Sequence, residues 1–437
     1  MDLPGLAALA LIAAEWLALG WLSGVAFPGQ PSTVASWALR LLVGAVLVGV
    51  TQLGLALVGV GFSSIAVALA VAATAAGAVG RAGSGRRAVS VDKITRTGRR
   101  ERVGWLLLGA VLVAAGLRSL LVPEAGWDAY SHWGLRAQAF TLAGTIVDAH
   151  SEHEYYPPLA PLLEAWLYLH RRGAISIDLA KAIWALVGSA FAVCLGWHLK
   201  LSLRRPWLAP YFALGIVLGT TALLEGFWTG QADLALTACL CLAALAAWQW
   251  QRSPDRAWLV QAGVFAAAAA LAKFEGAPRV GVLVVALVIG AAMARRRPPL
   301  AAAVSLTVGA AAAWLLWTSF QLGHGIAPNA EHLGGFDPLA LGGVALALLA
   351  VFGGIRTGGG VAVAVLAWAV AGRALFRTPL RPLSLIVLGQ LIATLLAFLL
   401  SATAPEVEVR TSATRLFEQW LPLALFVAAV GLDEVHL

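Results

Sequence analysis

Long apolar blocks dominate the pattern of hydrophobic and polar positions along this chain. They run for about 18 to 25 residues, the length that an α-helix needs to cross about 30 Å of hydrocarbon. Clear examples are Ala7–Phe27, Ser36–Phe62, Val103–Val122, Gly276–Ala294 and Leu383–Ser401. The pattern predicts an all-α polytopic membrane protein with a bundle of about 12 to 14 transmembrane helices.

A basic segment orients the predicted spans. Residues 81–102 hold eight Lys and Arg against two acids, and an excess of basic residues beside a span is typical of a cytoplasmic loop. Three spans are predicted before it, at about 5–26, 36–60 and 63–80. The next span, 103–122, then leads to an exoplasmic loop at 123–157.

Residues 158–170 are apolar but, as a helix, would extend only about 20 Å, too short to cross. They are predicted as a re-entrant or interfacial helix of the exoplasmic loop. Further spans are predicted at 177–199, 207–224, 231–250, 257–273, 276–294, 300–320, 383–401 and 415–432. Whether both short apolar runs within 339–376 cross the membrane stays open.

Composition supports the same class. Of the 437 residues, 60% are hydrophobic and only 12% are charged, which is too little polar surface for a soluble protein of this length. Segment 81–102, with eight basic residues against two acids, supplies six of the net charge of +8, so the charge indicates a topology anchor or lipid contact and no nucleic-acid partner. Cys194, Cys239 and Cys241 lie in apolar spans and are interpreted as small core residues.

The first polar cluster follows the span at 103–122. In a helix, Glu124, Asp128 and His132 would share one face at a spacing of four residues. The Trp and Tyr residues between them suit the membrane interface. The segment is either an ordinary interfacial loop with solvated acids or a catalytic site in which Asp128 is the general base.

The second polar cluster mixes imidazole with carboxylate, a ligand combination suited to a divalent cation such as Mg²⁺ or Mn²⁺. The potential ligands are His150, Glu152, His153 and Glu154. Short polar loops also contain such groups by chance, so solvation is the alternative.

Tyr155 and Tyr156 come directly before Pro157 and Pro158. Because proline is favoured in the first turn of a helix, the prolines predict a helix start with both tyrosines at its mouth.

Charged residues at the ends of later spans complete the candidate site. They are Glu225, Asp233, Lys273, Glu275, Arg410 and Arg415. Each has a structural interpretation, as a helix cap or as a pair at a helix end. Alternatively, Lys273 and the arginines contact an anionic ligand such as a lipid phosphate at the membrane surface.

Four short motifs, in this order, resemble those of C-type (GT-C) membrane glycosyltransferases. They are Asp128 in the first large exoplasmic loop, Tyr-Pro-Pro-Leu at 156–159, Lys-x-Glu-Gly at 273–276 and Thr-Ser-x-x-Arg-Leu-Phe at 411–417. The closest resemblance is to the bacterial branch related to lipid A aminoarabinose transferases and protein O-mannosyltransferases. It divides the chain into a glycosyltransferase core at 103–432 and an additional N-terminal segment, 1–102, of three helices with the basic loop.

The resemblance implies inverting transfer of a sugar from a polyprenyl-phosphate donor to an acceptor hydroxyl at the exoplasmic face. Asp128 matches the position of the family's catalytic base. Related enzymes often have Lys-Pro-Pro-Leu where this chain has Tyr156, so Lys273 and Arg415 are the remaining candidates for the phosphate contact. The acceptor, whether glycan, glycolipid or protein, stays open.

The implied location is a bacterial inner membrane, with a role in the cell envelope. Two other classes remain. A lipid or small-molecule transporter would also be a polytopic bundle with charges inside the membrane, although it should show repeats and broken helices. A non-catalytic scaffold of the same fold is the third class.

Overall fold

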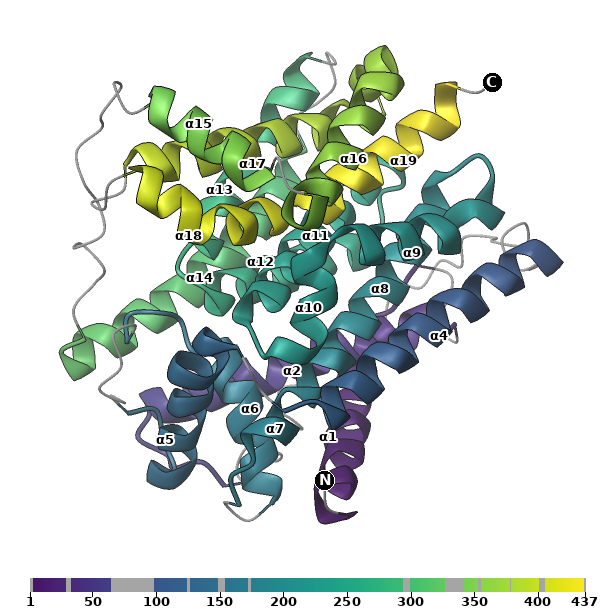
Figure 1. Ribbon diagram of the computed structural model, residues 1–437. Coiled ribbons are helices and arrows are strands. Elements are labelled where there is room, and N and C mark those ends of the chain that lie inside the picture. The colour runs from purple at the N-terminus through teal and green to yellow at the C-terminus, as the bar shows by residue number, and fades with distance from the viewer. Residues whose placement is uncertain are drawn as a thin grey trace.

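The computed structural model describes residues 3–28, 33–63, 98–123, 126–147, 154–171, 174–293, 299–326, 341–352, 355–377, 379–400 and 405–435. Every regular element in these ranges is a helix (Figure 1). Nine of the described helices are long and apolar enough to cross a membrane, and there are up to eleven such spans if each of two bent helix pairs counts as one. The protein is therefore an all-α polytopic membrane protein, as predicted. All but the first residue of the predicted span at 63–80 lies outside the described residues.

The helices follow the apolar blocks of the sequence closely. Their bounds are α1 Leu3–Leu22, α2 Val34–Leu57, α4 Arg99–Leu121, η1 Ala129–Gly134, α5 Leu135–Ala143, α6 Leu159–His170, α7 Ile177–Ala180, α8 Ala182–Ser202, α9 Ala209–Gly219, α10 Thr221–Thr229, α11 Ala232–Arg252, α12 Arg256–Ala272, α13 Gly276–Met293, α14 Leu300–His324, α15 Leu341–Phe352, α16 Ile355–Ala371, α17 Arg381–Leu399, α18 Pro405–Glu418 and α19 Leu421–Val435. At 12 residues, α6 is too short to cross, as predicted.

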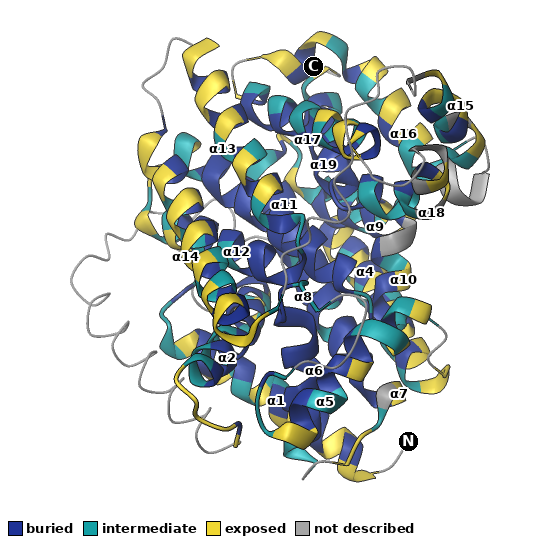
Figure 2. Ribbon diagram, turned by 90° about the vertical axis from the view of Figure 1, so that its left-hand side faces the viewer, coloured by how far each residue is buried: buried dark blue, intermediate teal, exposed yellow. Residues whose placement is uncertain are grey.

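Helix α11 is the centre of the bundle (Figure 2). In the most apolar 18-residue stretch of each span, all residues of α11 are buried. The share is 83% in the span that contains α8 and only 28% in α4. A helix that is apolar on all sides is covered either by protein or by lipid. The exposed apolar side chains of α1, α4, α14 and α16 are therefore the surface that faces hydrocarbon.

The first two helices are integrated into this bundle through polar contacts with α6. Gln52 of α2 donates to the carbonyl of Leu162 in α6 at 3.2 Å. Glu15 of α1 accepts from Trp166 Nε1 at 3.1 Å and contacts His170 Nε2 at 2.9 Å. Because a polar group inside a membrane protein is costly without a partner, these contacts fix α1 and α2 against α6.

Two predicted spans are broken in the structure, which corrects the sequence-based bounds. The span predicted at 207–224 forms α9 and α10, bent by 67°, and the span predicted from 415 is divided into α18 and α19, bent by 45°. The second break has a clear cause. Pro422 has no N–H to donate to Glu418, four residues earlier, and α18 ends at Glu418.

Small residues bring α1 and α2 into close contact. A Cβ atom added at Gly20 would overlap the backbone carbonyl of Arg40, and one added at Gly44 would overlap that of Trp16. Glycine at both positions lets the two helix backbones touch, a packing mode common in membrane bundles.

We expect Gly44→Ala to lower the free energy of unfolding by about 1–3 kcal/mol, because the added methyl group forces α1 away from α2. Gly109→Ala is the matched control, since nothing lies within 4 Å of a Cβ added there. That variant should instead gain up to about 1 kcal/mol of helix propensity. Thermal unfolding in detergent, followed by tryptophan fluorescence, measures both. Equal midpoints for the two variants would contradict this packing.

Candidate functional site

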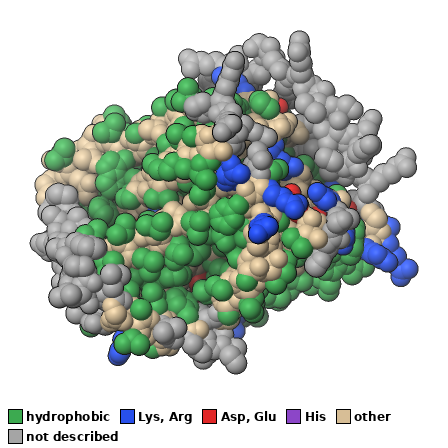
Figure 3. Space-filling model, turned by 90° about the horizontal axis from the view of Figure 1, so that it is seen from above, with side chains coloured by type: hydrophobic (Ala, Val, Ile, Leu, Met, Phe, Trp, Pro, Cys, Tyr) green, Lys and Arg blue, Asp and Glu red, His purple; other side chains and the backbone are tan. Residues whose placement is uncertain are grey.

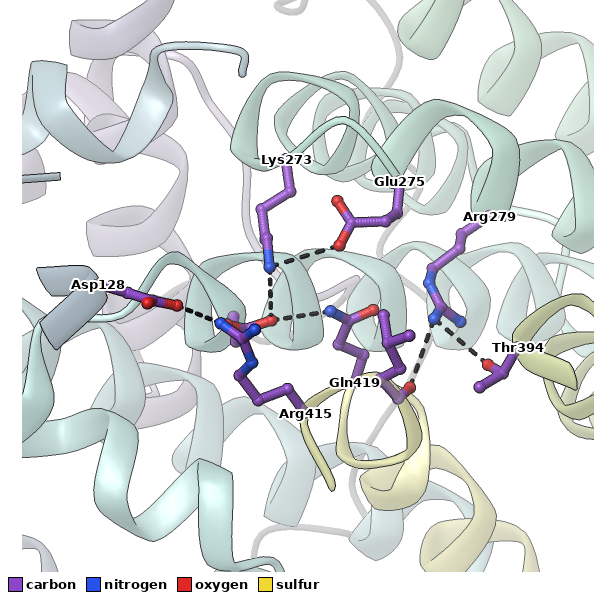
Figure 4. Close-up of polar contacts among 9 residues, drawn as sticks. Asp128, Lys273, Glu275, Arg279, Thr394, Arg415 and Gln419 are labelled. Atoms are coloured by element: carbon purple, nitrogen blue, oxygen red, sulfur yellow. Dashed lines mark hydrogen bonds and ion pairs between the residues drawn. The ribbon is translucent and has the colours of Figure 1, made fainter. Parts of the chain in front are cut away.

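Five charged residues from separate parts of the sequence meet at the ends of the central helices (Figure 4). We call Asp128, Asp233, Lys273, Glu275 and Arg415 the ion cluster. Asp128 directly precedes η1, Asp233 lies in the first turn of α11, and Lys273 and Glu275 occupy the junction between α12 and α13. Arg415 lies in the last turn of α18. All five were predicted as site residues from the sequence.

The centre of the ion cluster is a buried ion pair. Lys273 Nζ lies 2.9 Å from Asp233 Oδ1 and 3.4 Å from Glu275 Oε1. The side chains of Lys273 and Asp233 are only 7% and 5% exposed. Gln419 donates to the same Asp233 oxygen at 2.8 Å. Charges so deeply buried are tolerated only when they are paired and hydrogen-bonded, so these groups fix one another.

The edge of the ion cluster is a more open ion pair. Arg415 donates from Nη1 to Asp128 Oδ2, which links α18 to the segment before η1 across 287 residues of sequence. Here the side chains are 35% and 28% exposed. The ion cluster therefore changes from a partly solvated pair at its mouth to a buried pair at its base.

The two tyrosines line the ion cluster. The ring of Tyr156 stacks on Tyr155 at 4.8 Å between centroids, and Lys273 Nζ lies 5.8 Å from the Tyr156 ring centroid. Burial raises the pKa of Tyr155 to about 12, so its phenol is neutral and able to donate at physiological pH. The backbone carbonyl of Tyr155 accepts from Trp317 Nε1 of α14 at 3.1 Å. These contacts hold the tyrosine pair at the start of α6, as the two prolines predict.

Arg279 belongs to the site but was missed in the sequence analysis. It lies in α13, is 4% exposed, and donates to Gln390 Oε1 at 2.9 Å, to Thr394 Oγ1 at 3.3 Å and to the carbonyl of Leu416 at 3.4 Å. Leu416 is the neighbour of Arg415, so Arg279 fixes the end of α18. A basic residue one turn into an apolar span is itself a sign of function, and that signal was available.

Three buried polar atoms around the ion cluster have no hydrogen-bond partner among the described residues. They are Glu275 Oε2, Arg279 Nε and Gln419 Oε1. Because nearly all buried polar atoms in proteins are satisfied, these three atoms mark where a further polar group would find hydrogen-bond partners.

The remaining predicted site residues are not part of the ion cluster. Glu225 on α10 and Arg410 on α18 are exposed, and His132 is half-buried within η1. Glu154 is also half-buried, and its carboxylate acts electrostatically on Arg136. The other four residues, Glu124, His150, Glu152 and His153, lie outside the described residues.

The predicted metal site has no counterpart in the described part of the chain. Nowhere in it do three or more His, Cys, Asp or Glu side chains gather closely enough to hold a metal ion. Three of the four predicted ligands are outside this part, so the prediction of a divalent cation stays a prediction.

Basic residues gather at the opposite end of the bundle. Lys200, near the end of α8, lies 2.7 Å from Glu101 at the start of α4, and Gln249 near the end of α11 donates to Ser202 at 3.2 Å. The rise along α11 separates Gln249 from Asp233 by about 24 Å. Figure 3 shows Lys and Arg side chains concentrated at one end of an otherwise largely hydrophobic face. The ion cluster and the basic end therefore lie on opposite sides of the bundle.

We expect Asp233→Asn to destabilise the protein by about 3–5 kcal/mol, because Lys273 would keep a buried charge without its main partner. Replacing both partners, as in Asp233→Leu with Lys273→Met, should recover most of that loss, since no buried charge would be left unpaired. Thermal unfolding of the two variants beside the unchanged protein decides this. If the double variant is as unstable as Asp233→Asn, the pairing does not explain the cost.

The chain has no match among protein-family models, curated proteins or solved structures. The geometry and chemistry of the ion cluster are therefore the basis for a functional proposal.

Proposed function

We propose that the protein is a membrane glycosyltransferase that moves a sugar from a polyprenyl-phosphate donor to an acceptor hydroxyl with inversion. The observation that carries this proposal is the partly exposed pair of Asp128 and Arg415, which stands beside a buried Lys273. A base, a phosphate-binding guanidinium and a second cation are the groups that such a transfer needs. Here they converge from distant parts of the chain.

The distribution of charge supports an exoplasmic site. Basic residues beside spans mark the cytoplasmic side of a membrane protein, and the ion cluster lies at the other end of α11. A polyprenyl donor keeps its lipid tail in the bilayer and its sugar phosphate at the surface. A cluster at the helix ends, open at Asp128 and Arg415, suits a substrate of that shape.

Binding of the donor would exchange the partner of Arg415. In the ion cluster and its neighbour Arg279, three carboxylates balance three cations, so no cation is in excess for an incoming phosphate. Arginine forms bidentate contacts with phosphate as well as with carboxylate, and Arg415 is the more exposed of the two cations in the cluster. If the phosphate takes Arg415, the carboxylate of Asp128 is released at the moment when a base is required.

Sugar transfer would then be a single displacement at the anomeric carbon. The acceptor oxygen attacks the anomeric carbon, its proton passes to Asp128, and the bond between the anomeric carbon and the phosphate oxygen breaks. The electron pair leaves with the lipid phosphate, whose charge Arg415 stabilises at close range and Lys273 from deeper in the site. Attack opposite the leaving phosphate inverts the anomeric centre.

One observation favours transport as a second candidate function. Transporters often bind substrate where membrane helices are broken, and the break between α18 and α19 contains Gln419, which contacts Asp233. A transporter would release its lipid or solute unchanged, whereas a transferase yields a free polyprenyl phosphate. The fate of the bound lipid therefore separates the two functions.

We expect Arg415→Gln to weaken binding of a polyprenyl monophosphate by about tenfold or more, the typical effect of losing hydrogen bonds to a charged group. Asp128→Asn should strengthen it, because the competing carboxylate is removed from Arg415. Equilibrium binding to the purified protein measures both effects. Lys273 is unsuitable for this test because its loss would leave Asp233 buried and unpaired.

The matched control is Arg118→Gln, at the end of α4, where the guanidinium stacks over Trp228 at 4.5 Å. This variant should bind the lipid like the unchanged protein. Weaker binding by Asp128→Asn would contradict the exchange of partners, and equal binding by Arg415→Gln would remove Arg415 from the site.

A further inference from the structure

A second concave feature lies beside the last turn of α4 and does not involve the ion cluster. It is a cavity of about 410 Å³, within the usual size range of small-molecule sites. One wall consists of residues 120–123, and the facing wall includes Arg171, Ser176 and Asp178. The two walls differ sharply in chemistry.

The first wall is apolar and open, since Leu121 is 75% exposed and Val122 is 38% exposed. The facing wall carries both signs of charge within eight residues of sequence, from Arg171 to Asp178. A cavity with one apolar wall and one doubly charged wall fits an amphiphilic molecule better than a purely polar solute.

Buried polar groups lie on α6 and at the start of α8, the helices that precede and follow the charged lining residues in the chain. Lys181, which is 1% exposed, donates to the carbonyl of Val122 in the cavity wall. Glu164 accepts from Trp184 Nε1 at 2.8 Å. The hydroxyl of Tyr168 is buried and has no hydrogen-bond partner among the described residues. Polar groups are costly to bury in a membrane protein, so this concentration calls for a reason beyond packing.

The position of the cavity matches the surface of a bilayer. Helix α4 has 23 residues and extends about 34 Å, enough to cross the hydrocarbon. It starts at the basic end of the bundle, where Glu101 contacts Lys200. Its last residues, which form the apolar wall, are therefore at the far surface, where lipid head groups lie.

We propose that this cavity binds the head group of a zwitterionic, amine-bearing glycerophospholipid. The lipid phosphate would contact Arg171, its ammonium group Asp178, and its acyl chains the apolar wall at residues 120–123. A purely anionic head group would face the Asp178 carboxylate, so the charge pattern favours a head group with both signs. The proposal is independent of sugar transfer at the ion cluster.

The test uses native mass spectrometry of the purified full-length protein in mild detergent. The added probes are phosphatidylethanolamine, phosphatidylglycerol and a polyprenyl monophosphate. Phosphatidylethanolamine should bind in preference to phosphatidylglycerol. Arg171→Gln and Asp178→Asn should each reduce its binding by about tenfold, as expected for lost contacts to charged groups.

A third variant, Ser176→Trp, fills the cavity without changing charge and should abolish phosphatidylethanolamine binding. Thermal unfolding shows whether this variant is folded. Arg118→Gln is the control, because it lies on the same helix but outside the cavity lining, and it should bind like the unchanged protein.

Unchanged phosphatidylethanolamine binding in all three cavity variants would overturn the proposal. So would equal binding of phosphatidylglycerol that does not respond to Asp178→Asn, because the amine would then play no part. Polyprenyl monophosphate binding that is lost in Arg171→Gln and in Ser176→Trp would assign the cavity to the donor lipid and would also overturn the proposal.

Discussion

The buried ion pair between Lys273 and Asp233 is the interaction on which the functional end of the bundle depends. It ties the first turn of α11 to the junction of α12 and α13, and through Gln419 it also holds the end of α18. Desolvation makes such a pair costly, and a hydrophobic pair would pack the same helices at lower cost. We infer that the charges are kept for the chemistry of the site.

The position of the outer pair, Asp128 and Arg415, depends on the buried pair. With the end of α18 held by Gln419 and by the contact of Arg279 with Leu416, Arg415 projects to the mouth of the ion cluster, where it meets Asp128. The inner pair is nearly inaccessible and the outer pair partly solvated. A ligand would therefore compete with Asp128 for Arg415, while the buried pair of Lys273 and Asp233 stays intact.

The sequence predicted the spans well because their signal is local. An apolar run reports directly on the hydrocarbon that it crosses, and the predicted spans at 276–294 and 383–401 became α13 at 276–293 and α17 at 381–399. The break near Pro422 was overlooked because the apolar run continues through it. The span at 207–224, which the structure divides into α9 and α10, was predicted as continuous for the same reason.

The members of the ion cluster were also predicted, since an acid or a base in an apolar chain stands out. Their pairing could not be, because Asp128 and Arg415 are 287 residues apart and nothing in a single sequence joins them. Arg279 was missed although a basic residue one turn into an apolar span is itself a signal. Its contact with Gln390, 111 residues away, could not be predicted, because it forms only once α13 and α17 pack together.

The most direct test of the account is mass spectrometry of the lipids that co-purify with the unchanged protein and with Asp128→Asn in mild detergent. A polyprenyl-phosphate sugar should be enriched on Asp128→Asn, because that variant keeps the phosphate contact of Arg415 but has no base for transfer. The mass of the lipid would identify the donor sugar. Equal amounts of a polyprenyl-phosphate sugar in the two samples, or none in either, would contradict the account, whatever phospholipid the cavity beside α4 retains.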